Sequence, residues 1–225
     1  MTADRDADAS SNGLIEEFAR TRSQLEREEL LARNEKSLSA ETVSELAKKV
    51  VERVRVDVHQ ARALAESALL IAEKRGGKEE VALGFRAKAN ALYASGDHKE
   101  AVAHHDRAFE LYSQVGNQKE AARTLSSSLQ PLILLGEYDR AFQASQRARE
   151  IFTQLDDPWR LARLEINVGN IFHRQDRFHE GAGRVGLCFA FVLGLVGGGR
   201  SRQEADGRGG GERSNGHDLL LVWNG

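Results

Sequence analysis

The chain has 225 residues, 40% of them hydrophobic and 29% charged, which is enough apolar material for one or two folded domains. Its formal net charge of -2 argues against a nucleic-acid partner, because nucleic-acid binding usually requires a basic surface. The single cysteine, Cys188, excludes an intramolecular disulfide and a multi-cysteine metal site. The start of the chain is acidic and lacks the apolar segment of a secretory signal, so we expect a cytoplasmic protein.

The first 38 residues precede any repeated pattern. Residues 1–13 are polar and are expected to be disordered, whereas residues 14–38 are expected to form a charged capping helix. Its apolar side chains would cover the first helical hairpin. In the alternative hypothesis, Leu14–Lys36 is a short coiled-coil arm through which two copies associate. The apolar side of this helix would consist of Leu14, Phe18, Leu25 and Leu31.

A forty-residue repeat follows. Units over residues 81–118 and 121–157, and an incomplete unit over 158–180, keep the same spacing without insertions, opening at Ala82, Ala122 and Ala162. A divergent unit over residues 39–76 precedes them. In that unit we expect Ser39 as N-cap and helices over Lys49–Arg55 and Val58–Lys74.

Each unit reads as two helices joined by a turn. Gly96-Asp97 and Gly136-Glu137 separate the two helices of a unit, and Gly116-Asn117 ends one. Asp157-Pro158 predicts an N-cap followed by a first-turn proline. Small residues seven apart on the second helices would let antiparallel helices approach closely; they are Ala61, Ala68, Ala101, Ala108, Ala141 and Ala148.

The segments GFRAKANALYASGD, HKEAVAHHDRAFELY and EINVGNIFHRQDRF resemble tetratricopeptide repeats, in the longer variant of about forty residues. The resemblance covers residues 82–180 and extends more loosely back to about residue 41. It implies an all-α fold of antiparallel helix-turn-helix repeats stacked as a right-handed solenoid. It also implies a fragment of a larger, often bacterial, sensor or adaptor protein of the kind in which an effector domain follows the repeats.

Residues 181–225 form a glycine-rich tail that does not continue the repeat, since Gly181 stands where an alanine is needed. We consider a shifted reading frame, or a divergent end in which Val185–Val196 replaces the missing helix. A membrane anchor is disfavoured, because the apolar run is well short of the roughly twenty residues that a span requires. Without a covering helix, the apolar face of the last unit would be partly exposed; it comprises Leu161, Leu164, Val168, Ile171 and Phe172.

No catalytic, metal or cofactor motif emerges, so we expect a non-enzyme without cofactor or metal. A phosphate-binding GxxxxGK[ST] loop is absent. His104 and His105 are adjacent on a helix and point about 100° apart, which makes shared metal ligation difficult. Cys188 lies in an apolar run without a charged activator, which favours inert burial.

In tetratricopeptide arrays the first helix of each unit lines a concave groove, which is the usual ligand surface of the family. The resemblance therefore implies a non-catalytic scaffold that binds a protein or peptide, with neither nucleic acid nor membrane as partner. Self-association, through the N-terminal helix or the open end near Phe172, is the alternative. The predicted groove residues are Arg86, Asn90 and Tyr93; Arg123, Ser126, Ser127, Gln130 and Ile133; and Arg163, Asn167, Asn170, His173 and Arg174.

Two features of this surface remain open. Amides can bond a peptide backbone in both directions, but Asn90, Asn167 and Asn170 equally suit structural bonds between neighbouring helices. Arg86 with Asn90 resembles the first element of the family's carboxylate clamp. The remaining elements match only loosely, so a clamp is disfavoured.

Overall fold

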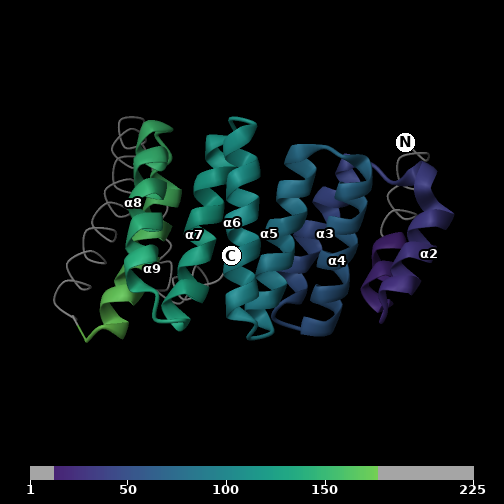
Figure 1. The fold of residues 1–225 in the computed structure, drawn as a ribbon, viewed down its shortest axis with the longest axis horizontal. Coiled ribbons are helices and arrows are strands. Elements are labelled where there is room, and N and C mark those ends of the chain that lie inside the picture. Colours follow the sequence, from purple (N-terminus) through teal and green to yellow (C-terminus); the bar gives the residue numbers. More distant parts are fainter. Residues whose placement is uncertain (1–12, 177–225) are drawn as a thin grey trace, which may run out of the picture.

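The computed structural model describes residues 13–176, and the regular structure in that range is entirely helical (Figure 1). The predictions for residues 1–12 and for 177–225, including the glycine-rich tail, lie outside the described residues. The elements are a helical stretch over residues 13–20, α2 (Gln24–Asn34), the 3₁₀ helix η1 (Glu35–Ser37), α3 (Ala40–Arg53), α4 (Val58–Arg75), α5 (Lys78–Ala94), α6 (His98–Gln114), α7 (Gln118–Leu134), α8 (Tyr138–Gln154) and α9 (Pro158–Arg174).

From α3 onward, each helix packs against the next one in an up-and-down path (Figure 1). The first helices of successive pairs also touch, since α3 contacts α5, α5 contacts α7, and α7 contacts α9. The described part of the chain is therefore a helical solenoid in which the first helices are neighbours. The predicted all-α repeat class is confirmed.

The connections from α5 to α9 share one geometry. A residue in the left-handed region follows each helix, and the next N–H reaches back over the turn, as Asp97 donates to the Leu92 carbonyl at 2.9 Å. Glycine adopts this conformation without steric cost, and aspartate tolerates it. Positive φ angles recur every twenty residues, at Gly76, Gly96, Gly116, Gly136, Asp156 and Asp176.

The small residues predicted on the second helices are buried. Each of them has an exposed fraction of 0%. Since a larger side chain would push the helices apart, these positions set the close packing between neighbouring helices. They are Ala61, Ala68, Ala101, Ala108, Ala141 and Ala148.

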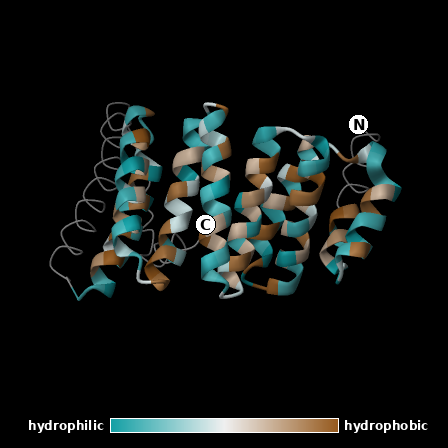
Figure 2. Cartoon of the chain, viewed as in Figure 1, coloured by the Kyte–Doolittle hydropathy of each residue, from teal (hydrophilic) through white to brown (hydrophobic). Residues whose placement is uncertain are grey.

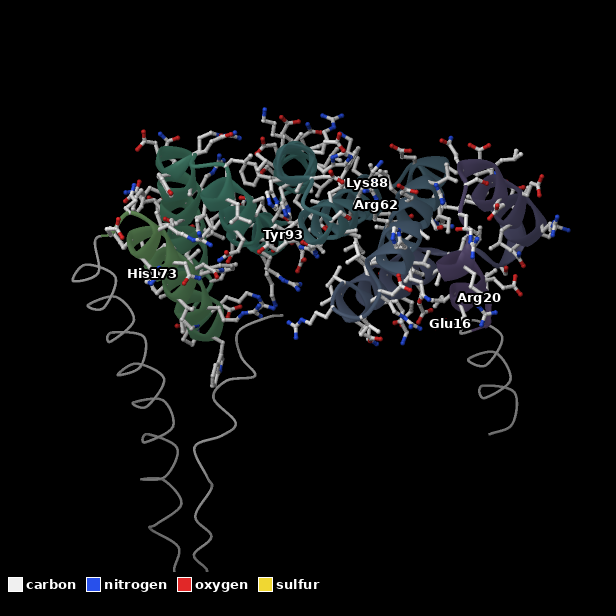
Figure 3. All side chains as sticks on the ribbon, turned by 90° about the horizontal axis from the view of Figure 1, so that it is seen from below. Glu16, Arg20, Arg62, Lys88, Tyr93 and His173 are labelled. Atoms are coloured by element: carbon white, nitrogen blue, oxygen red, sulfur yellow. The ribbon has the colours of Figure 1, made fainter. Side chains whose placement is uncertain are left out.

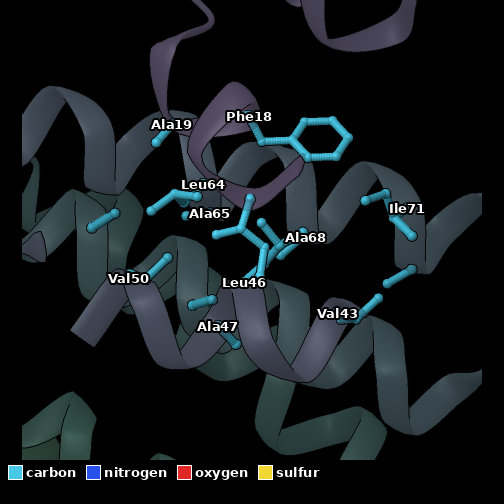
Figure 4. Packing of buried hydrophobic residues seen from close by; sticks show 14 of the residues in the cluster. Phe18, Ala19, Val43, Leu46, Ala47, Val50, Leu64, Ala65, Ala68 and Ile71 are labelled. Carbon is cyan, nitrogen blue, oxygen red and sulfur yellow. The ribbon is translucent and has the colours of Figure 1, made fainter. Parts of the chain in front are cut away.

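The N-terminal segment folds as two helices rather than as one continuous capping helix. The break falls at residues 21–23, where the Thr21 hydroxyl donates to the Phe18 carbonyl at 2.7 Å and Ser23 caps α2. Phe18 is fully buried against α3 and α4 (Figure 4), so the segment covers the first hairpin. Leu25 is 65% exposed, and its predicted place on the apolar side is wrong, because the break turns it away from the core.

Ser39 caps the first repeat helix, as predicted. Its hydroxyl accepts from the Thr42 N–H at 3.3 Å, and its own N–H donates to the Thr42 hydroxyl at 3.1 Å, which forms a capping box. The predicted first helix over Lys49–Arg55 begins too late, since α3 runs from Ala40 to Arg53. The second predicted helix, Val58–Lys74, agrees with α4 to within one residue.

The apolar face of α9 is largely buried. Leu164, Val168, Ile171 and Phe172 have exposed fractions between 0% and 4%. They belong to one cluster with buried residues of α7 and α8, and the Phe172 ring lies 5.1 Å from that of Phe142. These four residues are therefore buried, whereas Leu161 is half-buried. The segment whose absence would expose this face lies outside the described residues.

Each helix carries both hydrophobic and hydrophilic residues (Figure 2). α8 buries one side and keeps the other polar, whereas α4 is buried on most of its sides. Within residues 13–176, none of the helices combines the length and the apolar character that crossing a bilayer requires.

Gly84 marks a close approach of α5 to α4, and it supports a first prediction. A Cβ at this position would lie 2.8 Å from the Leu69 Cα, which is backbone and cannot swing aside. We expect Gly84→Ala to lower the free energy of unfolding by about 1–3 kcal/mol through overpacking, measured by urea denaturation. Ser44→Ala, at the matching exposed position of α3, should change it by less than about 0.5 kcal/mol. If the free energy of unfolding of Gly84→Ala equals that of the wild type, α4 and α5 can move apart without cost and the close approach is not a constraint.

His105 on α6 is a polar member of the core. It is 1% exposed, and its Nδ1 has no hydrogen-bond partner among the described residues. Burial, together with the nearby charges of Arg86 and His104, lowers its pKa from 6.5 to about 3. Between pH 6.5 and about 3, His105 binds a proton in the unfolded chain but stays neutral in the folded chain, so stability falls as pH drops below 6.5.

We therefore expect His105→Leu to weaken the loss of stability in acid. In the wild type, titration of the His105 imidazole should lower the free energy of unfolding by up to about 1.4 kcal/mol for each pH unit between pH 6 and pH 4. Urea unfolding at both pH values measures the slope. A slope identical in wild type and His105→Leu would show that His105 is protonated in the folded chain without penalty.

Candidate partner-binding groove

The first helices of the repeats enclose two connected hollows of about 440 and 370 Å³. Their walls come mainly from α3, α5, α7 and α9, so the groove spans every repeat in the described part of the chain. We call the two hollows together the groove. They share Val51, Asn90, Ser126, Ser127 and Arg163.

The larger hollow lies beside the N-terminal halves of these helices and is rich in positive charge. We call it the basic half. Its charged lining residues are Lys48, Arg86, Arg123, Arg160, Arg163 and the acidic Glu52.

The second hollow lies beside the C-terminal halves of the same helices and carries mostly neutral groups. We call it the amide half. Four amides face it together with the Tyr93 ring and several apolar side chains. The amides are Asn90, Gln130, Asn167 and Asn170, and the larger apolar residues are Val51, Val54 and Ile166.

Arg86 is held by an ion pair and is not free to bind a partner. Its guanidinium donates to Glu120 at 2.5 Å, its side chain is 11% exposed, and it lies over the Tyr112 ring at 5.3 Å. Arg123 binds the same carboxylate at 2.8 Å. Burial alone would raise the pKa of Glu120, but the two arginines outweigh it and hold that pKa below the usual value. Glu120 therefore connects α5 to α7.

Arg163 is different, because no acidic partner faces it among the described residues. Desolvation in the groove, followed by repulsion from Arg123 and Arg160, lowers its pKa. Arg160 is itself paired with Asp157. The α9 side of the basic half thus carries unneutralised positive charge.

The amides divide between structural and free roles. Gln130 Nε2 donates to Asn167 Oδ1 at 3.3 Å, which joins α7 to α9 and supports the structural alternative for Asn167. Asn90 and Asn170 line the groove, and their side chains make no hydrogen bond within the described residues. These two amides remain available to a ligand.

The predicted groove residues separate into three groups. Arg86, Asn90, Tyr93, Arg123, Ser126, Ser127, Gln130, Arg163, Asn167 and Asn170 line the groove. His173 and Arg174 are exposed at the end of α9 and do not line it; Figure 3 shows His173 at the α9 end of the array and Tyr93 near its middle. Ile133 is 4% exposed and packs in the core, so its predicted place in the groove is wrong.

Sequence reasoning missed the α3 wall and Arg160. This wall consists of Lys48, Val51 and Glu52 of α3, with Val54 and Arg55 of the turn that follows it. Arg160 lies in the first turn of α9, before Arg163, the first residue of this helix that was predicted to line the groove. A count of charges at matching repeat positions would have found it, since position 160 matches the acidic Glu80 and Glu120.

No family model matches this chain, and the comparison with curated proteins gives no match either. Among solved structures, the fold is similar to the crystal structure of BtubC (BKLC) from P. vanneervenii, with a TM-score of 0.52 and 16% sequence identity. The alignment covers 96% of this chain and 97% of that chain. At this identity the likeness shows the fold, a helical array, and nothing of the ligand.

The Glu120 ion pairs support a prediction about stability. Glu120→Gln leaves the Arg86 charge nearly buried without a counter-charge, so we expect the free energy of unfolding to fall by about 1–3 kcal/mol at pH 7. Because the folded pKa of Glu120 is lowered from 4.5, this contribution is present above that value and disappears as pH falls further. The difference between wild type and variant should therefore shrink in acid.

Glu110→Gln is the matched control. Glu110 pairs with Arg107 on the surface, where both side chains are more than half exposed, so its loss should change stability by less than about 1 kcal/mol. Urea denaturation of both variants at pH 7 and pH 4 measures this. Equal effects of the two substitutions would contradict a structural role for Glu120.

Proposed function

We propose that this chain is a non-catalytic interaction module that binds a peptide segment of a partner protein in the groove. The observation that carries the proposal is a continuous hollow across the first helices of successive repeats. Free amides such as Asn90 and Asn170 suit a peptide backbone, since each offers a donor and an acceptor. Arginines suit carboxylates in the same ligand.

We further propose that the repeats are tetratricopeptide repeats of the longer, forty-residue kind. The support comes from the regular period, the helical pairs, the left-handed turns and the buried alanines of the second helices. The likeness to BtubC is consistent with this proposal at the level of the fold.

Self-association is the weaker candidate. The apolar residues of the N-terminal segment pack on α3 and α4 of the same chain, and Phe172 is 4% exposed. Both surfaces considered for self-association are thus largely used within one chain. Deleting the segment would uncover the first core cluster, so an effect of that deletion would not show dimerisation.

Selection from a random dodecapeptide library tests the proposal. Peptides enriched on the wild-type chain are synthesised with a fluorescent label, and their affinities are measured by fluorescence anisotropy. Arg163→Ala and Asn170→Ala should each weaken binding by about tenfold, because each removes a group that faces the groove. Circular dichroism melts check that the variants remain folded.

Arg107→Ala is the control, because Arg107 is exposed on α6 and pairs only with Glu110 on its own helix. It should leave the affinities unchanged. If enriched peptides bind wild type, Arg163→Ala and Asn170→Ala equally well, the groove is not the binding site and the proposal fails.

A further inference from the structure

The acidic residue at one place in the repeat becomes basic in the last described unit. Glu80, Glu120 and Arg160 occupy matching positions, forty residues apart. Glu80 pairs with Arg75, and the single carboxylate of Glu120 pairs with both Arg86 and Arg123. At the same place in the last unit, Arg160 puts a cation near Arg163 and pairs with Asp157, the N-cap residue of its own helix. At this position α9 therefore lacks the acidic residue that pairs with arginines in the middle of the array.

The charges that line the basic half do not balance. Five cations face it, and Glu52 is the single acid among the described residues that line it. Glu52 is held by Lys49 at 2.8 Å. With these ion pairs formed, Arg163 still lacks a counter-ion, Arg123 shares one carboxylate with Arg86, and Arg160 pairs with Asp157. The nearby N-termini of α7 and α9 add partial positive charge to the same end of the groove.

The amide half has the opposite character. It adds Arg55 but no acidic residue among those described, and Val51, Val54, Tyr93 and Ile166 supply apolar surface. Val51 is 43% exposed and lines both hollows, so its side chain is accessible to a ligand. The groove therefore concentrates positive charge in the basic half, whereas the amide half combines amides with exposed apolar side chains.

From these two sides we infer the chemistry of the occupant, an inference that rests on the proposed function. We propose that the groove binds an internal acidic peptide segment, with a side-chain carboxylate at Arg163, which lies near Arg123 and Arg160 and has no ion pair of its own among the described residues. An apolar side chain of the same segment lies against Val54, Tyr93 and Ile166. Because the basic half and the amide half lie on opposite sides of the groove, the segment can place its acidic and apolar side chains correctly in only one orientation.

A chain-terminal carboxylate held by Arg86 and Asn90 is a different ligand, and the ion pairs disfavour it. Arg86 is already bound to Glu120 and nearly buried, so it has no free face for a terminal carboxylate. The unpaired cation lies on α9 instead. A nucleic acid also fits poorly, because most of the positive charge lies in the basic half of the groove rather than along a continuous basic stripe.

The test uses dodecapeptides selected on the wild-type chain, together with the oligonucleotide dT12 as a competitor. We expect enriched peptides to carry Asp or Glu on one side of an apolar residue, and their affinity to fall as salt rises. Arg163→Gln should weaken them by about tenfold or more and reduce the salt dependence, whereas Arg163→Lys should retain part of the affinity. Ile166→Ser should weaken binding without changing the salt dependence. Arg107→Gln, on the surface of α6, should do neither.

The remaining outcomes are distinct. Neutral or basic peptides that bind in the groove, lose affinity with Ile166→Ser and ignore Arg163→Gln would overturn the acidic ligand and leave the proposed function standing. Displacement of the peptides by dT12 at similar concentration would also overturn it, because the groove would then prefer polyanions in general. If no enriched peptide responds to any groove variant, the proposed function fails together with this inference.

Discussion

The hydrogen-bonded reversal that joins helices α5 to α9 is the constraint on which the array depends. In one such connection, the Asp97 N–H returns to the Leu92 carbonyl, while the Asp97 carbonyl accepts from Ala101 and begins the next helix. One residue therefore closes one helix and opens another. Because the connection is short and its hydrogen bonds fix its geometry, successive helices must run antiparallel and in contact. Repeating it every twenty residues brings equivalent side chains back every forty.

That return gives the groove its chemistry. Positions forty residues apart lie on neighbouring first helices. Each row of side chains across the groove therefore consists of two or three residues spaced forty apart in the sequence. A substitution in one copy therefore changes one place in the row and leaves the helical packing intact, provided that the buried alanines of the second helices are kept. Rows that line the groove include Arg123 with Arg163, Ser126 with Ile166, Ser127 with Asn167, and Asn90 with Gln130 and Asn170.

The period was sufficient to predict the helical pairs, the caps at Ser39 and Asp157, and most of the groove wall on α5, α7 and α9. It was not sufficient for α3. The repeat would place Leu46 and Val50 at the groove positions held by Arg86 and Asn90, yet both are fully buried under the N-terminal segment. That segment is not part of the repeat, and its packing exposes the neighbouring face of α3 to the groove. A tertiary contact of this kind leaves no periodic signal in the sequence.

Residue type alone also fails to tell a structural arginine from one that is available to bind. Arg86 and Arg163 both face the groove, but Glu120 reaches Arg86 from the next repeat, and Arg160 stands where the corresponding acid would serve α9. The pair of Glu120 with Arg86 thus compensates charge in the middle of the array and stabilises the stacking of α5 on α7. The same pairing leaves the α9 side short of negative charge. The acid at this position thus joins α5 to α7 through Glu120, and the base at the matching position of α9, Arg160, leaves Arg163 without a counter-ion, which a ligand can supply.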